Sequence, residues 1–231
     1  MNRVDVDGKS TCVINIGNGK YKVVGGNLND KDKNIYVGTI NENGAFIPQN
    51  SIGVTTSTTS FYYSDAKGGG RWRVGSVIDT KDKSGNNFLT MIISNNPPMF
   101  DDYIINARNN HPYDFKVTNG TGEKYGDEKF YRGMPIGVTG NGQIIFTSAR
   151  DVGNIAAGYV AAANGMSWEA SRIAFDTYQG GVEGISTRYA EYYGWKMGYN
   201  NTTNNQKADN LMSSFGSLLH TIRNYILNKI R

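Results

Sequence analysis

Residues 143–163 read QIIFTSARDVGNIAAGYVAAA, and this stretch decides the fold class of the chain. Residues 143–147 show the alternation of a half-buried β-strand. Residues 148–163 are typical of a helix, which ends at Asn164-Gly165 because glycine tolerates the left-handed conformation that closes a helix. Since β-type patterns come before this stretch and helical patterns after it, the sequence predicts an α+β protein.

The first part of the chain predicts an antiparallel β-structure. Short β-branched and aromatic runs occupy residues 12–16, 21–24, 35–40 and 72–78. Between them lie turn sequences such as Gly17-Asn18-Gly19 and Asn43-Gly44, which tolerate positive φ. A mixed region follows, in which Ser84 and Pro97-Pro98 each open a short helix and residues 113–117 alternate like a strand.

The last third of the chain predicts helices. Ser167 caps a helix that reaches Gln179 and ends at Gly180-Gly181, and Thr187 opens the next one. Residues 200–205 are typical of a polar linker. Residues 208–230 carry apolar side chains at spacings of three and four, which predicts a final amphipathic helix that docks onto the domain's own core.

Composition excludes several classes of protein. The chain has 231 residues, 38% hydrophobic and 19% charged, so it is too apolar for a disordered tail. No run of about 18 apolar residues occurs, which excludes a transmembrane helix. The first residues lack the pattern of a secretory signal peptide, and export is therefore expected to use another route.

Side chains that bind soft metals are scarce. Cys12 is the single cysteine, and only two histidines, His111 and His220, accompany it, so the spacings of zinc sites are missing. The phosphate-binding loop, the dinucleotide fingerprint and the serine nucleophile motif are missing as well. We therefore expect no metal and no cofactor, and we exclude classical ATPases, kinases and dehydrogenases.

The charge of the chain is mildly basic. The formal net charge is +4, and most of the excess lies in residues 131–231, which hold 9 basic and 6 acidic side chains. Such an excess permits an anionic partner such as nucleic acid, but it is also ordinary for a soluble surface. Charge alone therefore hardly separates a nuclease from another hydrolase.

Asp114 and Lys116 form the first candidate catalytic pair. In a strand over residues 113–117 they lie on the same face, because side chains alternate between the two faces. A carboxylate beside an ammonium can serve as acid or base and as electrostatic stabiliser in a hydrolysis. The alternative interpretation is an ordinary charge pair on an exposed strand.

A second candidate group occupies the first turns of the helix over residues 148–163, namely Arg150, Asp151 and Asn154. The positive end of a helix can hold an anion, and with the first pair this group makes up the predicted catalytic set. The alternative is capping, since an aspartate favours a first helical turn without any function. The small residues that follow predict that another element approaches this helix closely.

Five further residues are expected to contact the substrate. They combine a loop histidine, an arginine, a tyrosine, and an amide and a carboxylate near the end of a helix. The alternative for the last two is that they satisfy backbone groups at the helix end. The expected substrate-binding residues are Tyr113, His111, Arg132, Gln179 and Glu183.

Two segments resemble known families. Residues 2–8, NRVDVDG, resemble the end of an RHS-repeat core, where a variable C-terminal toxin begins. Residues 102–199 resemble the bacterial polymorphic toxin type 44 family through YDFK at 113–116, RDVGN at 150–154 and the stretch 194–199. Direct matches to the family's phrases are Asp114, Lys116, Gly153, Asn154 and Gly158. Two positions depart from those phrases, Ile155 and Ala156, where the family has an aromatic residue and an asparagine.

The residue patterns and the resemblance together predict four parts of the chain. Residues 1–10 are the tail of the RHS core, residues 11–100 a β-rich region with short helices at its end, residues 101–200 the catalytic region, and residues 201–231 a linker with the terminal helix. The resemblance further implies a secreted effector used in competition between bacteria. Such an effector is delivered into a neighbouring cell as part of a larger RHS protein, which encloses it, and a cognate immunity protein neutralises it in the producer.

Three functions stay open on this basis. The first hypothesis is a metal-independent RNase, in which Lys116 and Arg150 stabilise the charge on phosphorus and an aspartate, Asp114 or Asp151, is the general base. The second is a peptidoglycan hydrolase acting in the periplasm, whose acid and base are two carboxylates, Asp114 with Asp151 or Glu183. The third is a non-enzymatic module whose terminal amphipathic helix acts on membranes.

Overall fold

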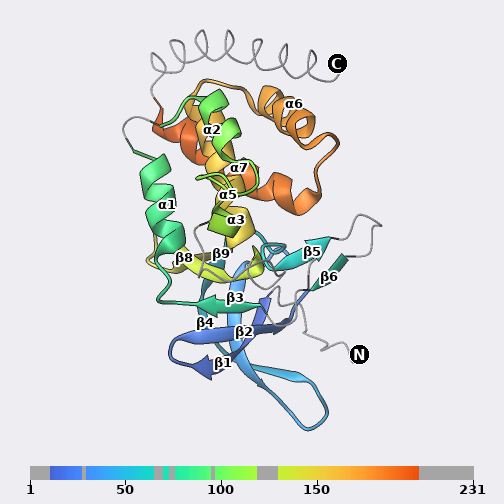
Figure 1. Ribbon diagram of the computed structural model, residues 1–231. Helices are drawn as coiled ribbons and strands as arrows, with labels where there is room; N and C mark the ends of the chain where they lie inside the picture. Colours follow the sequence, from blue (N-terminus) through green and yellow to red (C-terminus); the bar gives the residue numbers. More distant parts are fainter. Residues whose placement is uncertain are drawn as a thin grey trace. The chain divides into compact units, whose positions relative to one another are not determined.

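The computed structural model describes residues 11–27, 30–64, 70–72, 76–94, 97–118 and 130–202 (Figure 1). The chain divides into two compact units. Unit 1 comprises residues 1–89 and 119–152, and unit 2 comprises residues 90–118 and 153–231. Unit 1 holds the strands, and unit 2 holds most of the helical residues.

Seven of the described strands of unit 1 form a closed barrel. Their order around the barrel is β1 (Thr11–Gly17), β2 (Lys20–Gly25), β7 (Val77–Asp79), β8 (Gly133–Val138), β9 (Ile144–Ser148), β4 (Phe46–Thr55) and β3 (Asn34–Ile40). The pairs β1–β3, β4–β9 and β7–β8 are parallel, and the remaining pairs are antiparallel. The α+β class is therefore confirmed, whereas the prediction of an antiparallel sheet is right only in part. Parallel pairs join segments that no tight turn connects, so turn signals do not reveal them.

Alternate residues of the strands fill the barrel. Its core is a cluster of buried side chains, Val13, Val23, Ile35, Val37, Phe61, Ile78 and Phe146. Four predicted strands are confirmed, at residues 12–16, 21–24, 35–40 and 143–147. The single strand predicted over residues 72–78 is wrong. Its first residue ends β6 (Gly70–Trp72), which pairs with β5 (Tyr62–Ser64) in a separate two-stranded sheet, and its last residues begin β7.

Two of the described helices, α1 (Ser84–Ile92) and α5 (Ala149–Ala163), begin in unit 1, and both were expected from the sequence. Unit 2 adds α2 (Phe100–Asn106), α3 (Phe115–Thr118), α6 (Trp168–Gln179) and α7 (Ile185–Asn201). The limits of α6 are as predicted, because Ser167 Oγ accepts a hydrogen bond from the Ala170 N–H and Gly180 closes the helix at φ 75°. The helix expected from Thr187 is α7, which begins two residues earlier and continues to Asn201, into the expected linker.

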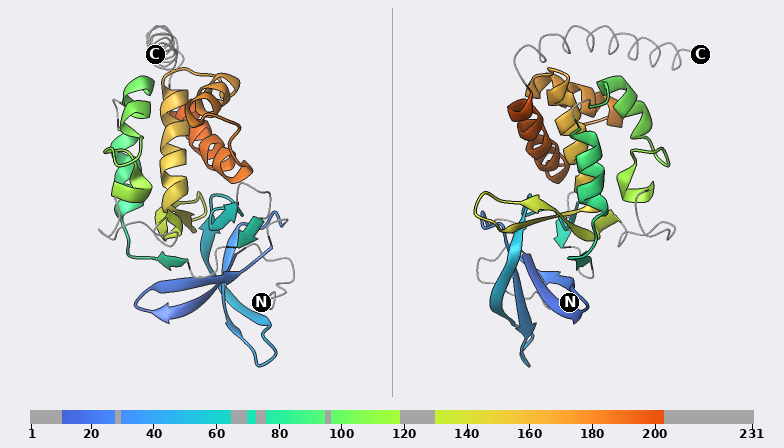
Figure 2. Two further views of the ribbon diagram at one scale, coloured as in Figure 1. Left: turned by 45° about the vertical axis from the view of Figure 1, so that its right-hand side comes forward. Right: turned by 90° about the vertical axis from the view of Figure 1, so that its left-hand side faces the viewer.

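Helix α5 is the centre of unit 2 and lies between α2 and α7 (Figure 2). On one side, the Tyr103 hydroxyl of α2 donates to the carbonyl oxygen of Gly153 at 3.0 Å. On the other side, α5 and α7 meet at glycines. A Cβ at Gly158 would lie 1.9 Å from the Glu191 carbonyl oxygen, and one at Gly194 would lie 1.8 Å from that of Ile155. The predicted close approach to the small residues of α5 is therefore confirmed.

The strand predicted over residues 113–117 is wrong, because these residues enter the short helix α3. The Asp114 carbonyl oxygen accepts the N–H groups of Val117 and Thr118, and Asp114 Oδ2 accepts the Asn110 N–H at 2.9 Å. Such local bonds compete with strand pairing for the backbone. Asp114 and Lys116 consequently do not share a strand face.

Some predictions fall outside the described residues: the RHS-type segment 2–8, residues 203–205 of the linker and the terminal helix over residues 208–230. In the part of the chain that the structure describes, every helix is too short or too polar to span a bilayer.

Candidate active site

A partly buried arginine surrounded by three carboxyl groups is the densest charged cluster among the described residues of unit 2. Arg172 of α6 donates through Nη1 to Glu183 Oε2 at 2.9 Å. The same nitrogen also contacts Glu191 Oε2, and Nη2 contacts Asp176 Oδ1. Only 13% of the Arg172 side chain and 3% of the Glu191 side chain are exposed. We call this group the Arg172 cluster.

Local structure explains how the Arg172 cluster is assembled. Arg172 and Asp176 are one helical turn apart, so they lie on the same face of α6. Glu183 follows in the loop between α6 and α7, and its N–H donates to Asp176 Oδ1 at 3.0 Å. Glu191 lies on the side of α7 that faces α5, one turn before Gly194, where the two helices touch.

The carboxyl groups of this cluster differ in how the protein shifts their pKa. Burial, and then the adjacent carboxylate of Glu183, raise the pKa of Glu191 to about 10, although Arg172 acts in the opposite direction. The Glu183 N–H, followed by Arg172, keeps the pKa of Asp176 below its ordinary value. A nearby carboxylate disfavours the charged form of a second carboxyl group, and burial does the same. At neutral pH, Glu191 is thus a buried acid beside Glu183.

Arg172 also lies against two aromatic rings. Its Cζ atom lies 5.7 Å from the ring centroid of Trp168 and 5.8 Å from that of Phe175. Burial opposes the charge of the guanidinium, but the carboxylates of Glu183 and its neighbours outweigh this effect and raise the pKa of Arg172. The arginine therefore stays a cation.

In unit 1, Arg150 and Asp151 form a buried ion pair. Arg150 donates to Asp151 Oδ1 through Nε at 2.8 Å and Nη2 at 2.5 Å, and its Cζ lies 5.2 Å from the Tyr131 ring centroid. The Asp151 side chain is fully buried. Burial raises the pKa of Asp151, against the pull of Arg150 and of the hydroxyls of Ser60 and Ser148. This enclosed geometry is typical of a structural ion pair.

Other predicted site residues lie in unit 2 around the loop before α3. Asp114 is buried, and its carboxylate accepts a hydrogen bond from the Asn110 N–H. Tyr113 stacks on Tyr103 with ring centroids 5.4 Å apart, His111 is exposed and Lys116 is partly buried. Asn154 is a partly buried residue of α5.

The remaining predicted contacts have different surroundings. Gln179 is the exposed last residue of α6, and Glu183 belongs to the Arg172 cluster. Arg132 belongs to unit 1, where burial lowers its pKa and Asp82 acts in the opposite direction. Of the ten predicted site residues, the structure thus brings Glu183 into the cluster and pairs Arg150 with Asp151.

Three members of the Arg172 cluster, Arg172, Asp176 and Glu191, are not among the site residues predicted from the sequence. One signal was available. Small residues recur in α7 at Ala190, Gly194 and Gly198, and this marks a packed face that also includes Glu191, one turn before Gly194. A buried acid needs a partner, and Arg172 is the arginine of the preceding helix.

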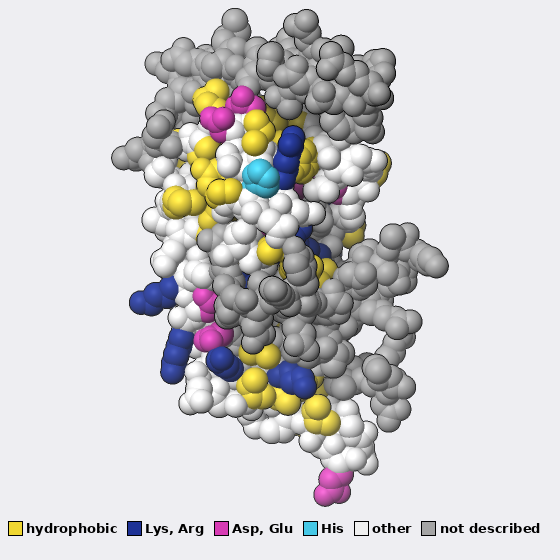
Figure 3. All heavy atoms as spheres, in the orientation of Figure 1, with side chains coloured by type: hydrophobic (Ala, Val, Ile, Leu, Met, Phe, Trp, Pro, Cys, Tyr) yellow, Lys and Arg dark blue, Asp and Glu magenta, His cyan; other side chains and the backbone are white. Residues whose placement is uncertain are grey.

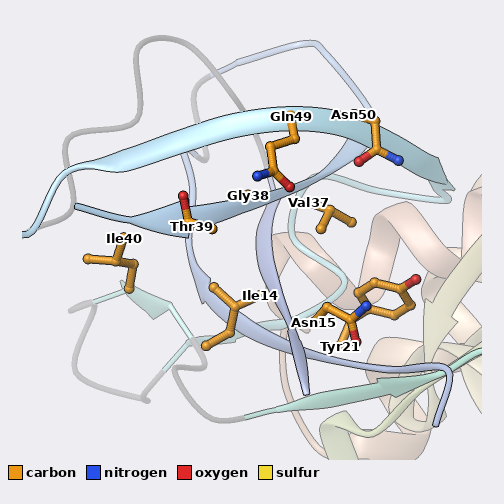
Figure 4. Close-up of a pocket in the computed structure, with 9 residues that line it drawn as sticks. All are labelled: Ile14, Asn15, Tyr21, Val37, Gly38, Thr39, Ile40, Gln49 and Asn50. Carbon is orange, nitrogen blue, oxygen red and sulfur yellow. The ribbon is translucent and has the colours of Figure 1, made fainter. Parts of the chain in front are cut away.

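A hollow of about 520 Å³ opens at one end of the barrel in unit 1. Figure 4 shows Gln49 and Asn50 of β4 on one side of it and Asn15 and Tyr21 on the other. The described residues that line it include no acid, no histidine and no cation. The hollow can receive a ligand, but its lining has no group suited to acid or base catalysis.

Among the described residues, histidine, cysteine and carboxylate side chains form no group of three that would hold a metal ion. Comparison of the chain with family models, with curated proteins and with solved structures finds no match.

Proposed function

We propose that this chain is the hydrolytic toxin domain of an RHS effector and that it cleaves the glycan strands of peptidoglycan in the periplasm of a neighbouring bacterium. One observation carries the proposal: Glu183 and Glu191 contact the same nitrogen of Arg172, and burial raises the pKa of Glu191 well above its ordinary value. Paired carboxyl groups with different protonation states are the usual machinery of glycoside hydrolysis. The RHS-type phrase and the type 44 resemblance support the assignment to a toxin, which is delivered with its RHS core and neutralised by an immunity protein.

The proposed reaction assigns different roles to the two glutamates. Glu191 protonates the glycosidic oxygen as the bond to the anomeric carbon breaks, and Glu183 stabilises the positive charge that develops there. Water then adds to the anomeric carbon and returns a proton to Glu191. Because Glu183 and Glu191 contact one nitrogen atom, their oxygens are less than about 6 Å apart, too close for the wide spacing of most inverting enzymes.

Access to the pair would come from the loop between α6 and α7. Gly180, Gly181 and Gly184 surround Glu183 in this loop, and a Cβ at any of these glycines would meet no atom within 4 Å. Val182 is 79% exposed, so little packing holds the loop in place. Movement of this loop would uncover Glu183 and Glu191 together.

RNA is the rival substrate, and the described residues favour it less. Phosphates bind to tracks of cations. In residues 90–118 and 153–202, the basic side chains are Arg108, Lys116, Arg172, Arg188 and Lys196. The acidic ones are Asp101, Asp102, Asp114, Glu169, Asp176, Glu183 and Glu191. On the face shown in Figure 3, basic side chains over the strands of unit 1 stand among acidic and hydrophobic ones.

The test is growth of a laboratory bacterium that expresses the chain with or without a periplasmic export signal. We expect killing only after export, its loss in the Glu191→Gln variant, and full killing by Glu42→Gln, which changes an exposed acid in the β3–β4 turn. Circular dichroism checks that both variants fold. Killing from the cytoplasm alone would contradict the proposal and favour the RNase.

A further inference from the structure

Unit 2 has a pocket beside Trp168, whose ring lies against Arg172. It is a pocket of about 280 Å³, formed where α5 ends, α6 begins and α7 passes by. The rings of Trp168, Trp195 and Tyr199 line it, and Gly165 and Ala162 contribute little bulk. The pocket is therefore a hollow with aromatic walls.

The aromatic rings are ordered by contacts with one another. Tyr199 stacks on Trp195 with centroids 5.0 Å apart and planes 21° apart, and Trp195 stacks on Tyr192 at 6.2 Å and 6°. Trp168 meets the edge of Trp195 at 6.2 Å. The Trp195 Nε1–H donates to the Met166 carbonyl oxygen at 3.0 Å. Ring orientation is thus set before any ligand arrives, which reduces the entropy lost on binding.

The charges around the pocket favour a neutral ligand. Glu169 is the one charged residue among the described residues that line it, and no arginine or lysine is among them. A phosphate group would meet the carboxylate without a surplus of cations. A sugar ring suits the site better, because its C–H hydrogens carry partial positive charge and the faces of aromatic rings are negative. The Glu169 carboxylate can accept hydrogen bonds from the hydroxyl groups of a sugar.

We propose that the pocket of Trp168, Trp195 and Tyr199 binds a pyranose ring of a glycan strand, next to the bond that the Arg172 cluster attacks. The inference rests on the proposed function and names a subsite of the same site. Trp168 connects the two places, since its ring lines the pocket and lies 5.7 Å from Arg172 Cζ. A ring held on the aromatic walls would present the neighbouring glycosidic bond to Glu183 and Glu191.

The test measures binding of chitotetraose, a neutral oligomer of N-acetylglucosamine, to the full chain by titration calorimetry and tryptophan fluorescence. Tyr199→Ala should weaken binding roughly tenfold, since it removes one stacking wall. Tyr189→Ala is the matched control. Tyr189 is 50% exposed on the same helix, against 51% for Tyr199, and it does not line the pocket. We expect this control to bind like the wild type.

Three results would overturn the inference: no binding of chitotetraose to the wild type, equal weakening by both tyrosine variants, or binding of single-stranded RNA in preference to the sugar. The Glu191→Gln variant separates this inference from the proposed function. Suppose that the wild type and this variant both bind chitotetraose tightly, but that the wild type leaves glycan strands intact. The sugar subsite would then stand, and the proposed hydrolase activity would be refuted.

Discussion

Replacing Gly158 by alanine should destabilise unit 2, because this glycine lets α5 and α7 touch. The new Cβ would lie 1.9 Å from the Glu191 carbonyl oxygen, 2.8 Å from its carbon and 2.9 Å from the Trp195 nitrogen. These are backbone atoms, so the helices must separate. Overpacking costs about 1–3 kcal/mol, and often more against backbone, while alanine gains about 1 kcal/mol of helix propensity. We expect a net loss of about 2 kcal/mol.

Gly153→Ala is the matched control, since Gly153 lies in the same helix and a Cβ there would meet no atom within 4 Å. This variant should gain up to about 1 kcal/mol. Urea unfolding followed by tryptophan fluorescence measures both, and thermal melts should show a loss of about 4–8 °C for Gly158→Ala. If Gly158→Ala were as stable as Gly153→Ala, the close contact that positions Glu191 would be refuted.

Two further predictions concern buried acids. Asp151→Ala should cost about 3–5 kcal/mol in urea unfolding, because it leaves the buried guanidinium of Arg150 without its counter-charge; a loss below about 0.5 kcal/mol would show that the pair is not structural. The pKa of Glu191 is about 10 in the folded state against an ordinary 4.5. Between these pH values the folded state keeps a proton that the unfolded chain has lost. The stability that this proton contributes is therefore complete below about pH 4.5 and declines as the pH rises towards 10. Glu191→Gln should therefore lose less stability than the wild type between about pH 5 and pH 9 in denaturant titrations, and parallel profiles would refute the raised pKa.

The Asp151 prediction affects how toxicity experiments are read. A double variant at Asp114 and Asp151 that loses toxicity does not by itself identify catalytic residues, because both side chains are buried and hold local structure. Glu191→Gln is a sharper probe. It keeps the shape of the side chain, and the raised pKa of Glu191 favours the neutral form that glutamine mimics.

Local signals predicted individual elements well. The limits of α6 follow from Ser167 and Gly180, whose capping and left-handed preferences act within a few residues. The same reasoning failed at residues 113–117, where alternation indicated a strand but the side chain and carbonyl of Asp114 bind the nearby backbone.

Long-range pairing lay beyond local signals. The barrel closes through parallel pairs such as Val54 with Ile145. Turn residues cannot predict such pairs, because the partners are far apart in the sequence. The Arg172 cluster depends on the same kind of contact, because Glu191 meets Arg172 only after α6 and α7 pack together. The sequence marked Glu183 as a candidate, but not its partners.

The most direct measurement is digestion of purified peptidoglycan sacculi by the folded chain, with the products identified by mass spectrometry. Our account predicts that the wild type releases soluble saccharide fragments with newly formed reducing ends, and that Glu191→Gln releases none while Glu42→Gln matches the wild type. Intact sacculi after treatment with the folded wild type, together with degradation of RNA by the same preparation, would contradict it.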